Sequence, residues 1–227
     1  MKRNNIKKEN MKKKTAIDII VVLDRSGSMQ SIKEQTISGF NEFLKDQKAN
    51  NKNARITLVQ FDHEYELVYE AREIRRAREL SPLTYVPRGM TALLDAIGRT
   101  IKITRQRHKQ LEKEERPQKT IFVIITDGYE NSSTIFTRQD IFKKITKMGN
   151  KHDWEFVYLG ANQDAIREAS NYGISAKRAM TFAADAMGAR DMFHDMSHNI
   201  VASAMFDKEI AFTEKQRTKQ KRSHKNN

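Results

Sequence analysis

The chain of 227 residues contains no cysteine, three prolines and one tryptophan, and its apolar runs are short. Without cysteine it can form neither a disulfide framework nor a zinc–thiolate site, which favours a reducing compartment. No apolar stretch approaches the roughly 18 to 20 residues that a membrane-spanning helix needs. We therefore expect a soluble, cytoplasmic protein that does not contact a membrane.

Positive charge is concentrated at the two ends of the chain. Residues 1–14 carry seven Lys or Arg against one Glu, and residues 214–227 carry six against one Glu. The net charges of these ends are +6 and +5, which leaves +2 of the total +13 for the rest. Both ends have almost no apolar side chains to offset the entropy of ordering, so we expect disordered basic tails. With no Gly/Ser-rich linker and no internal repeat, residues 15–213 are predicted to form one domain.

Within that domain, short apolar runs alternate with segments of helical periodicity. Such alternation is typical of an α/β fold with a mostly parallel central sheet. The segments 54–61 and 65–69 are separated by D-H-E, a hairpin signal that predicts one antiparallel edge strand. We expect a doubly wound sheet with helices on both faces. The predicted strands are 17–23, 54–61, 65–69, 120–126, 155–159 and 179–183, and the predicted helices are 31–48, 91–109, 137–148, 164–172 and 190–212.

The most informative segment, 17–29, reads I-D-I-I-V-V-L-D-R-S-G-S-M. Asp24, Ser26 and Ser28 alternate where the chain leaves an extended run, so their oxygens can converge on one point. Oxygen donors of this kind select Mg²⁺, Mn²⁺ or Ca²⁺ over zinc or copper. A Mg²⁺ ion needs about six oxygens at roughly 2.0 to 2.1 Å, so further ligands must come from elsewhere.

Two later segments offer the missing oxygens. Thr91 follows a loop punctuated by Pro and Gly and precedes apolar residues at helical spacing, which places it at a helix entrance. Asp127 follows the unbroken apolar run 120–126, the pattern of a central parallel strand that ends in a functional loop. Each signal alone also fits a simple turn or a helix N-cap, and only their combination in order favours a metal site.

Taken together, D-x-S-x-S after a first strand, G-x-T before a helix and T-D-G after a later strand resemble the von Willebrand factor A family. The resemblance covers residues 17–161, and L-D-R-S-G-S-M and I-T-D-G-Y-E-N look like the family's intracellular bacterial and phage-type branch. It implies a Rossmann-like fold with a metal-ion-dependent adhesion site. In that site Ser26, Ser28 and Thr91 supply hydroxyl ligands, while Asp24 and Asp127 bind directly or through water.

The resemblance also implies a function: a metal-dependent protein-binding module, an adaptor or scaffold whose ion is completed by an Asp or Glu of an acidic protein partner. Two carboxylates neutralise a divalent cation, so an incoming carboxylate meets no surplus negative charge. Met90, Tyr129 and Glu130 are expected to form the rim that contacts the partner. The sequence indicates neither the partner nor the oligomeric state.

Two other functions stay open. One is a nucleic-acid or ribonucleoprotein adaptor that acts through the basic tails. The other is a Mg²⁺-dependent, phosphatase-like enzyme, but the known aspartyl-phosphate enzymes need a second carboxylate where this chain has Ser26. No phosphate-binding loop or G-x-S-x-G nucleophile elbow is present, and no histidine is placed as a general base. We therefore expect no catalytic activity.

Overall fold

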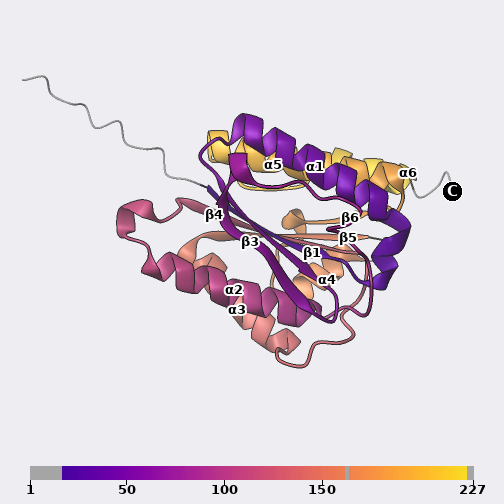
Figure 1. Cartoon of the computed structure of the whole chain (residues 1–227), viewed down its shortest axis with the longest axis horizontal. Coiled ribbons are helices and arrows are strands. Elements are labelled where there is room, and N and C mark those ends of the chain that lie inside the picture. Colours follow the sequence, from indigo (N-terminus) through magenta and orange to yellow (C-terminus); the bar gives the residue numbers. More distant parts are fainter. Residues whose placement is uncertain (1–16, 162–163, 224–227) are drawn as a thin grey trace, which may run out of the picture.

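The computed structural model describes residues 17–161 and 164–223, which form one six-stranded sheet covered by helices on both faces (Figure 1). The strand order is β3-β2-β1-β4-β5-β6. Neighbouring strands run parallel, except for the antiparallel pair of β2 and β3 at one edge. The predicted fold class and its antiparallel edge strand are confirmed. The strands are β1 (Ile17–Asp24), β2 (Arg55–Phe61), β3 (Tyr65–Glu73), β4 (Lys119–Thr126), β5 (Trp154–Ala161) and β6 (Ala179–Phe182).

The helices form a layer on each face of the sheet. Figure 1 shows α1, α5 and α6 on one side of the strands and α2 and α3 on the other. None of the described helices is long and apolar enough to cross a membrane. The helices are α1 (Lys33–Asn50), α2 (Leu93–Gln110), α3 (Arg138–His152), α4 (Ala165–Asn171), α5 (Ala186–Phe206) and α6 (Glu214–Ser223). Short 3-10 helices are η1 (Gly27–Ile32), η2 (Ile74–Arg76), η3 (Lys113–Glu115) and η4 (Ala176–Arg178).

The central strands are apolar on both faces because each face meets a helical layer. In β1, Ile19 and Val21 pack into the core beneath α1 and α5, whereas Ile20 and Val22 pack into the core beneath α2 and α3. All four side chains are fully buried. The strands from which the loops of the candidate site start therefore lie between two packed layers.

Two of the predicted helices have wrong boundaries. The helix predicted at 137–148 continues past Gly149 to His152, because Asp153 takes the left-handed conformation (φ 54°) and ends the helix there. The helix predicted at 190–212 begins earlier, where the Asp185 carboxylate accepts a hydrogen bond from Gly188 N. It also ends earlier, at Phe206, before Asp207 with φ 51°.

The C-terminal segment corrects the prediction of a solvated tail from residue 214. Residues 214–223 form α6, and Gln220 is buried between α5 and β6. Its side-chain amide donates to Gly188 O at 3.2 Å and accepts from Ala183 N at 3.2 Å. The composition of this segment did not predict the helix, because the hydrogen bonds of Gln220 to backbone groups of distant segments help to stabilise it. The predicted N-terminal tail, residues 1–14, lies outside the described residues, as do residues 224–227.

Candidate metal centre

Three loops meet at the carboxyl-terminal edge of the sheet. β1 and β4 are parallel neighbours, so Asp24 at the end of β1 and Asp127 directly after β4 emerge side by side. The third loop carries Thr91 and leads into α2. Crevices outside the carboxyl ends of parallel strands are the usual ligand sites of α/β sheets. The three segments singled out in the sequence therefore lie together.

The oxygens after β1 and β4 are spaced like adjacent ligands of one ion. Ser28 Oγ lies 3.2 Å from Ser26 Oγ and donates a hydrogen bond to Asp127 Oδ1 at 2.6 Å. Neighbouring oxygens of an octahedral Mg²⁺ site, each at about 2.1 Å, are about 3.0 Å apart. Ser28 is exposed whereas Ser26 is buried, so the set opens to solvent at Ser28. These donors fit a hard divalent cation.

Gly128 keeps the space between the loops open. A Cβ built on Gly128 would lie 3.2 Å from Thr91 Oγ1 and 3.6 Å from Ser28 Oγ. Both hydroxyls therefore border one space the size of a methyl group, which a glycine leaves free. The Thr91 loop is fixed there by Asn131, whose Oδ1 accepts from Thr91 N at 2.8 Å and whose own N donates to Thr91 O at 3.1 Å.

Asp24 is fully buried and tightly oriented. Its Oδ1 accepts from Ser26 N and its Oδ2 from Thr126 Oγ1, both at 2.6 Å, while Tyr85 OH donates to its backbone carbonyl at 2.6 Å. Burial raises the pKa of Asp24 to about 7, opposed by these hydrogen bonds and reinforced by the charge of Asp127. Burial also raises the pKa of Asp127, which the hydrogen bond from Ser28 partly offsets. A divalent cation bound beside these two carboxyls would favour their ionised forms and lower both pKa values.

Thr91 does not serve as the N-cap of α2. The residue before the helix is Ala92, which makes no side-chain capping bond. Instead Glu130 Oε2 accepts from Leu94 N at 2.8 Å, and Glu130 Oε1 accepts from Ser133 N at 2.7 Å. Thr91 Oγ1 is thus free of the capping role. Both oxygens of Glu130 accept hydrogen bonds inside the loop, and its contact with a partner stays a prediction.

The other two predicted rim residues do face solvent. Met90 and Tyr129 are 56% and 57% exposed, an unusual state for large apolar side chains. They belong to the loops that precede α2 and follow β4, on either side of the candidate site. Among the described residues no cluster of three or more His, Cys, Asp or Glu side chains could hold a metal, so an ion here would depend on the hydroxyls.

The von Willebrand factor type A domain is the family whose sequence pattern matches this chain, over residues 18–196. The chain belongs to that family. No curated protein sequence is similar enough to count as a relative. The match includes every strand and all of the loops described above, so the site lies inside the family domain.

Solved structures show the same fold at low sequence identity. The vWF domain of the pili tip protein Mfa5 from Porphyromonas gingivalis is 11% identical, with a TM-score of 0.58 and coverage of 84% of this chain and 97% of that one. The pilus adhesin SpaC from Lactobacillus rhamnosus GG is 12% identical, with a TM-score of 0.61 and coverage of 83% and 30%.

Proximal thread matrix protein 1 from the mussel byssus is also similar, at 13% identity and a TM-score of 0.59. The alignment covers 82% of this chain and 48% of the mussel chain, so this chain spans about half the length of that protein. A further structure of the mussel protein, with a TM-score of 0.53, has a zinc-occupied MIDAS motif, which is the metal-ion-dependent adhesion site.

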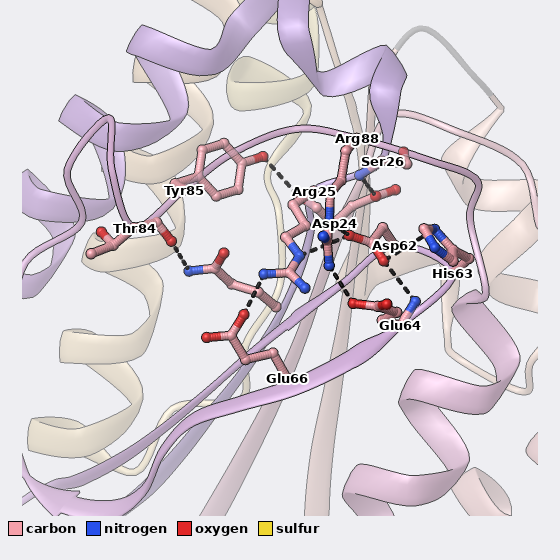
Figure 2. A network of polar contacts seen from close by, with 11 residues as sticks. Asp24, Arg25, Ser26, Asp62, His63, Glu64, Glu66, Thr84, Tyr85 and Arg88 are labelled. Atoms are coloured by element: carbon pink, nitrogen blue, oxygen red, sulfur yellow. Dashed lines mark hydrogen bonds and ion pairs between the residues drawn. The ribbon is translucent and has the colours of Figure 1, made fainter.

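Beside the candidate metal centre of this type A domain, two arginines clamp a buried aspartate (Figure 2). Asp62 Oδ2 accepts from Arg25 Nε at 3.0 Å and from Arg88 Nε at 2.9 Å. Asp62 Oδ1 accepts from Glu64 N at 2.6 Å, and Asp62 is fully buried. Burial alone would raise the pKa of Asp62, but the hydrogen bonds from Glu64 N and Arg88 and the charge of Arg25 lower it. Glu66 pairs with Arg25, and Glu64 pairs with Arg88, at the outer ends of this clamp.

The arginine clamp joins the same loops that carry the candidate metal ligands. Arg88 N donates to Arg25 O at 2.8 Å, and Gly27 N donates to Gly89 O at 3.1 Å. Gly89 has a φ of 64°, and a Cβ there would lie 2.1 Å from His63 Nδ1, so only glycine fits. Sequence inspection missed the clamp, although Arg25 lies inside D-R-S-G-S and Asp62 directly follows β2. The clamp sets the distance between the serines and Thr91.

Replacing Gly128 with alanine should weaken Mg²⁺ binding without unfolding the domain. The new Cβ would crowd Thr91 Oγ1, which cannot retreat because Asn131 holds its backbone on both sides. We expect the Kd measured by calorimetry to rise about tenfold, the lower end of what disturbing the surroundings of metal ligands costs. Gly149→Ala is the matched control, since its Cβ would meet only Trp154 O at 3.8 Å. Equal affinity in the two variants would contradict the placement of the ion beside Gly128.

Metal binding should also depend on pH. Because the pKa of Asp24 is raised to about 7, its carboxyl carries a proton below that pH and the ion must displace it. The apparent affinity for Mg²⁺ should therefore fall about tenfold between pH 8 and pH 6. Calorimetry in buffers of different ionisation enthalpy should show proton release at pH 6 and little at pH 8. An affinity that is constant over this range would show that Asp24 is not protonated in the metal-free domain.

Proposed function

We propose that this domain is a metal-dependent protein-binding module of the intracellular bacterial branch of its family. Asp24, Ser26, Ser28, Thr91 and Asp127 form a complete adhesion site for Mg²⁺ or Mn²⁺. The ion's open position takes a carboxylate from an acidic partner protein. The observation that carries the proposal is that Ser28 Oγ lies within hydrogen-bond distance of both Ser26 Oγ and Asp127 Oδ1, with Ser26 buried and Ser28 exposed to solvent.

The charge of the site suits an incoming carboxylate. Asp24 and Asp127 together balance a divalent ion, and the remaining donors are neutral hydroxyls. A partner carboxylate therefore approaches a Lewis-acidic ion without net repulsion. The exposed side chains of Met90 and Tyr129 offer apolar contact area beside it, which supports a macromolecular partner rather than a free anion.

The similar solved structures support a binding role. Their names describe a pilus adhesin, a pili tip protein and a matrix protein of mussel threads, and the last has a MIDAS motif that holds zinc. Mg²⁺ or Mn²⁺ is preferred here because all five proposed ligands are oxygens, with no thiolate or imidazole among them. A cytoplasmic location remains a prediction from the sequence.

Catalysis receives no support from the histidines. Three histidines pair with carboxylates. His63 lies 3.4 Å from Asp62, and His108 lies 2.6 Å from Asp18. His194 lies 3.5 Å from Asp195. Within residues 17–161 and 164–223, no hydrogen bond joins a histidine to a serine or threonine hydroxyl. The arrangement thus lacks the pair of nucleophile and base that hydrolysis by a serine would use. We propose a binding function without turnover.

Affinity capture from the native host tests the proposal. The full chain is immobilised and exposed to extract in Mg²⁺ and again in EDTA, after nuclease treatment. A partner should be retained only with Mg²⁺, lost with Asp24→Ala, and kept with Glu34→Ala, which removes an exposed carboxylate on α1. Replacing the acidic residues of the retained partner one at a time should identify a single one that abolishes binding.

Two outcomes would contradict the proposed function. Retention that survives EDTA and Asp24→Ala would show that the partner binds elsewhere. Retention that disappears with nuclease or moderate salt but is insensitive to the chelator would favour the nucleic-acid alternative, because phosphate contacts respond steeply to ionic strength.

A further inference from the structure

A small cavity with a strongly basic lining lies at the opposite end of the sheet from the metal centre. It measures about 150 Å³ and is formed by the C-terminal half of α2, the connector before β4 and the start of β5. Thr120 and Trp154, which pair across β4 and β5, form its floor. In the neighbouring strand Asp18 pairs with Thr120, six residues before Asp24, so the two sites are about 20 Å apart. The basic lining residues are Arg105, Lys109 and Arg116, and two histidines, His108 and His152, lie beside them.

The lining contains no acidic side chain. Among the described residues Arg105, Lys109 and Arg116 have no ion-pair partner, and only His108 contacts a carboxylate, that of Asp18. Arg105 Nε is buried and has no hydrogen-bond acceptor among the described residues. A buried guanidinium N–H without an acceptor is costly, and an anion in the cavity would satisfy it.

The electrostatic surroundings of His152 support this excess of positive charge. Its pKa is lowered, first by burial and then by the charges of Arg105, Lys147, Lys109 and Lys151. Cations at helix C-termini often serve only to balance the helix dipole, and α2 and α3 both end beside this cavity. Two dipoles supply a negative charge of only about one in total. The connector and the residue after α3 also carry the acidic side chains of Glu112, Glu114, Glu115 and Asp153, but none of them lines the cavity, so the positive charge of the lining is not paired there.

We propose that this cavity binds a phosphate group of a nucleic-acid backbone. Its volume suits one tetrahedral oxyanion with a water, but not a nucleoside. The guanidinium groups of Arg105 and Arg116 provide donors that match phosphate oxygens, although Arg116 Nε already donates to Leu111 O at 3.1 Å. Trp154 is 4% exposed, so it cannot stack on a base, and recognition is limited to the backbone.

The charge around the cavity favours a polyanion over an isolated phosphate. α2 and α3 carry further exposed lysines, and their only acidic residues, Asp95 and Asp140, are used in loop and capping hydrogen bonds. A polymer with evenly spaced phosphates places one phosphate in the cavity while its neighbours lie near the exposed lysines of α2 and α3. The exposed lysines are Lys102, Lys143, Lys147 and Lys151.

The chain provides its own reporter, because Trp154 is its only tryptophan and lines the cavity. The full chain is titrated at constant ionic strength with inorganic phosphate, a DNA duplex, an RNA strand, phosphatidylserine vesicles and a poly-glutamate peptide. Each titration is repeated with Arg105→Gln/Arg116→Gln and with Lys45→Gln/Lys52→Gln. The control pair removes the same charge from exposed positions outside the cavity.

Inorganic phosphate and nucleic acid should both change the fluorescence of Trp154 in the wild type and in the control. In the arginine variant we expect nucleic-acid affinity to fall about tenfold or more. The slope of log K against log salt should shrink by roughly 0.9 per lost duplex contact. Inorganic phosphate should raise the Tm of the wild type but not that of the arginine variant. The Tm of the arginine variant without ligand should be unchanged or higher, since the variant removes repulsion between cations and keeps the fold.

Three results would overturn the proposal. Equal losses in the arginine and control variants would show a diffuse charge effect. Loss of vesicle or poly-glutamate binding with unchanged nucleic-acid binding would assign the cavity to a membrane or an acidic protein. A fall in the Tm of the ligand-free arginine variant, with no response of Trp154 to phosphate in the wild type, would show that the arginines only support the fold.

Discussion

Replacing Asp24 with alanine should abolish Mg²⁺ binding in calorimetry while the domain stays folded. Asp24 is the only fully buried carboxylate of the candidate site, and two hydrogen bonds, from Ser26 N and Thr126 Oγ1, aim its oxygens. We expect a loss of affinity of more than about a hundredfold, since disturbing the partners of a ligand already costs 10- to 100-fold.

The same variant should be as stable as the wild type without metal, or more stable at alkaline pH. Because the folded-state pKa of Asp24 is raised to about 7, ionisation of the buried carboxyl opposes folding as the pH rises from about 4 to 7. Alanine removes that cost. The metal-free Tm of Asp24→Ala at pH 8 should therefore equal or exceed that of the wild type, and added Mg²⁺ should raise the Tm of the wild type only.

Thr126→Val is the graded control for Asp24→Ala. It removes the hydroxyl that donates to Asp24 Oδ2 but keeps the carboxylate, so binding should weaken without disappearing. Unchanged Mg²⁺ affinity in Asp24→Ala would refute the site. A metal-free Tm well below that of the wild type would show that Asp24 is a structural residue first.

Replacing Asp62 with alanine should cause the largest loss of stability in the domain. The substitution leaves buried Arg25 with only the half-exposed Glu66 as its partner and removes the acceptor that Arg88 shares. Breaking a buried charge pair by removing one partner costs about 3 to 5 kcal/mol. For a domain of this size the Tm should fall by roughly 10 °C, at about 2 to 4 °C per kcal/mol.

Asp62→Ala should also weaken Mg²⁺ binding, because the arginine clamp fixes the Thr91 loop relative to the serines. The matched control is Glu64→Ala, which removes the outer partner of Arg88, on an exposed side chain. Exposed pairs contribute little, so its Tm and metal affinity should stay close to those of the wild type. Similar losses in the two variants, measured by thermal denaturation and calorimetry, would show that burial of Asp62 is not what stabilises the clamp.

The sequence was informative wherever the determining contacts are local or periodic. The apolar runs of β1 and β4 predicted central strands because burial on both faces leaves no room for polar alternation. The D-x-S-x-S spacing predicted that Asp24, Ser26 and Ser28 come together, since the three residues lie within one turn. Helix ends were less certain, because Asp153 and Asp207 end helices in a left-handed conformation that composition does not reveal.

Contacts between distant segments were beyond the sequence alone. The sequence indicated Glu130 only as a rim residue, but its carboxylate also accepts a hydrogen bond from Leu94 N at the start of α2, 36 residues earlier in the chain. The arginine clamp joins Arg25, Asp62 and Arg88 from three loops, and no periodicity links them. Which of several charged residues become partners depends on which loops the sheet order brings together.

Thus the sequence by itself determined the α/β class, the antiparallel edge strand and the residues of the candidate metal centre. The tertiary structure decided that Thr91 and Ser28 border one space at Gly128, that α6 packs on β6, and that α2 and α3 form a basic cavity around Trp154. The physical reason is the distance along the chain over which each kind of interaction acts. Hydrophobic periodicity and turn chemistry act over a few residues, whereas buried charges and polar side chains take their roles from neighbours that only the folded chain supplies.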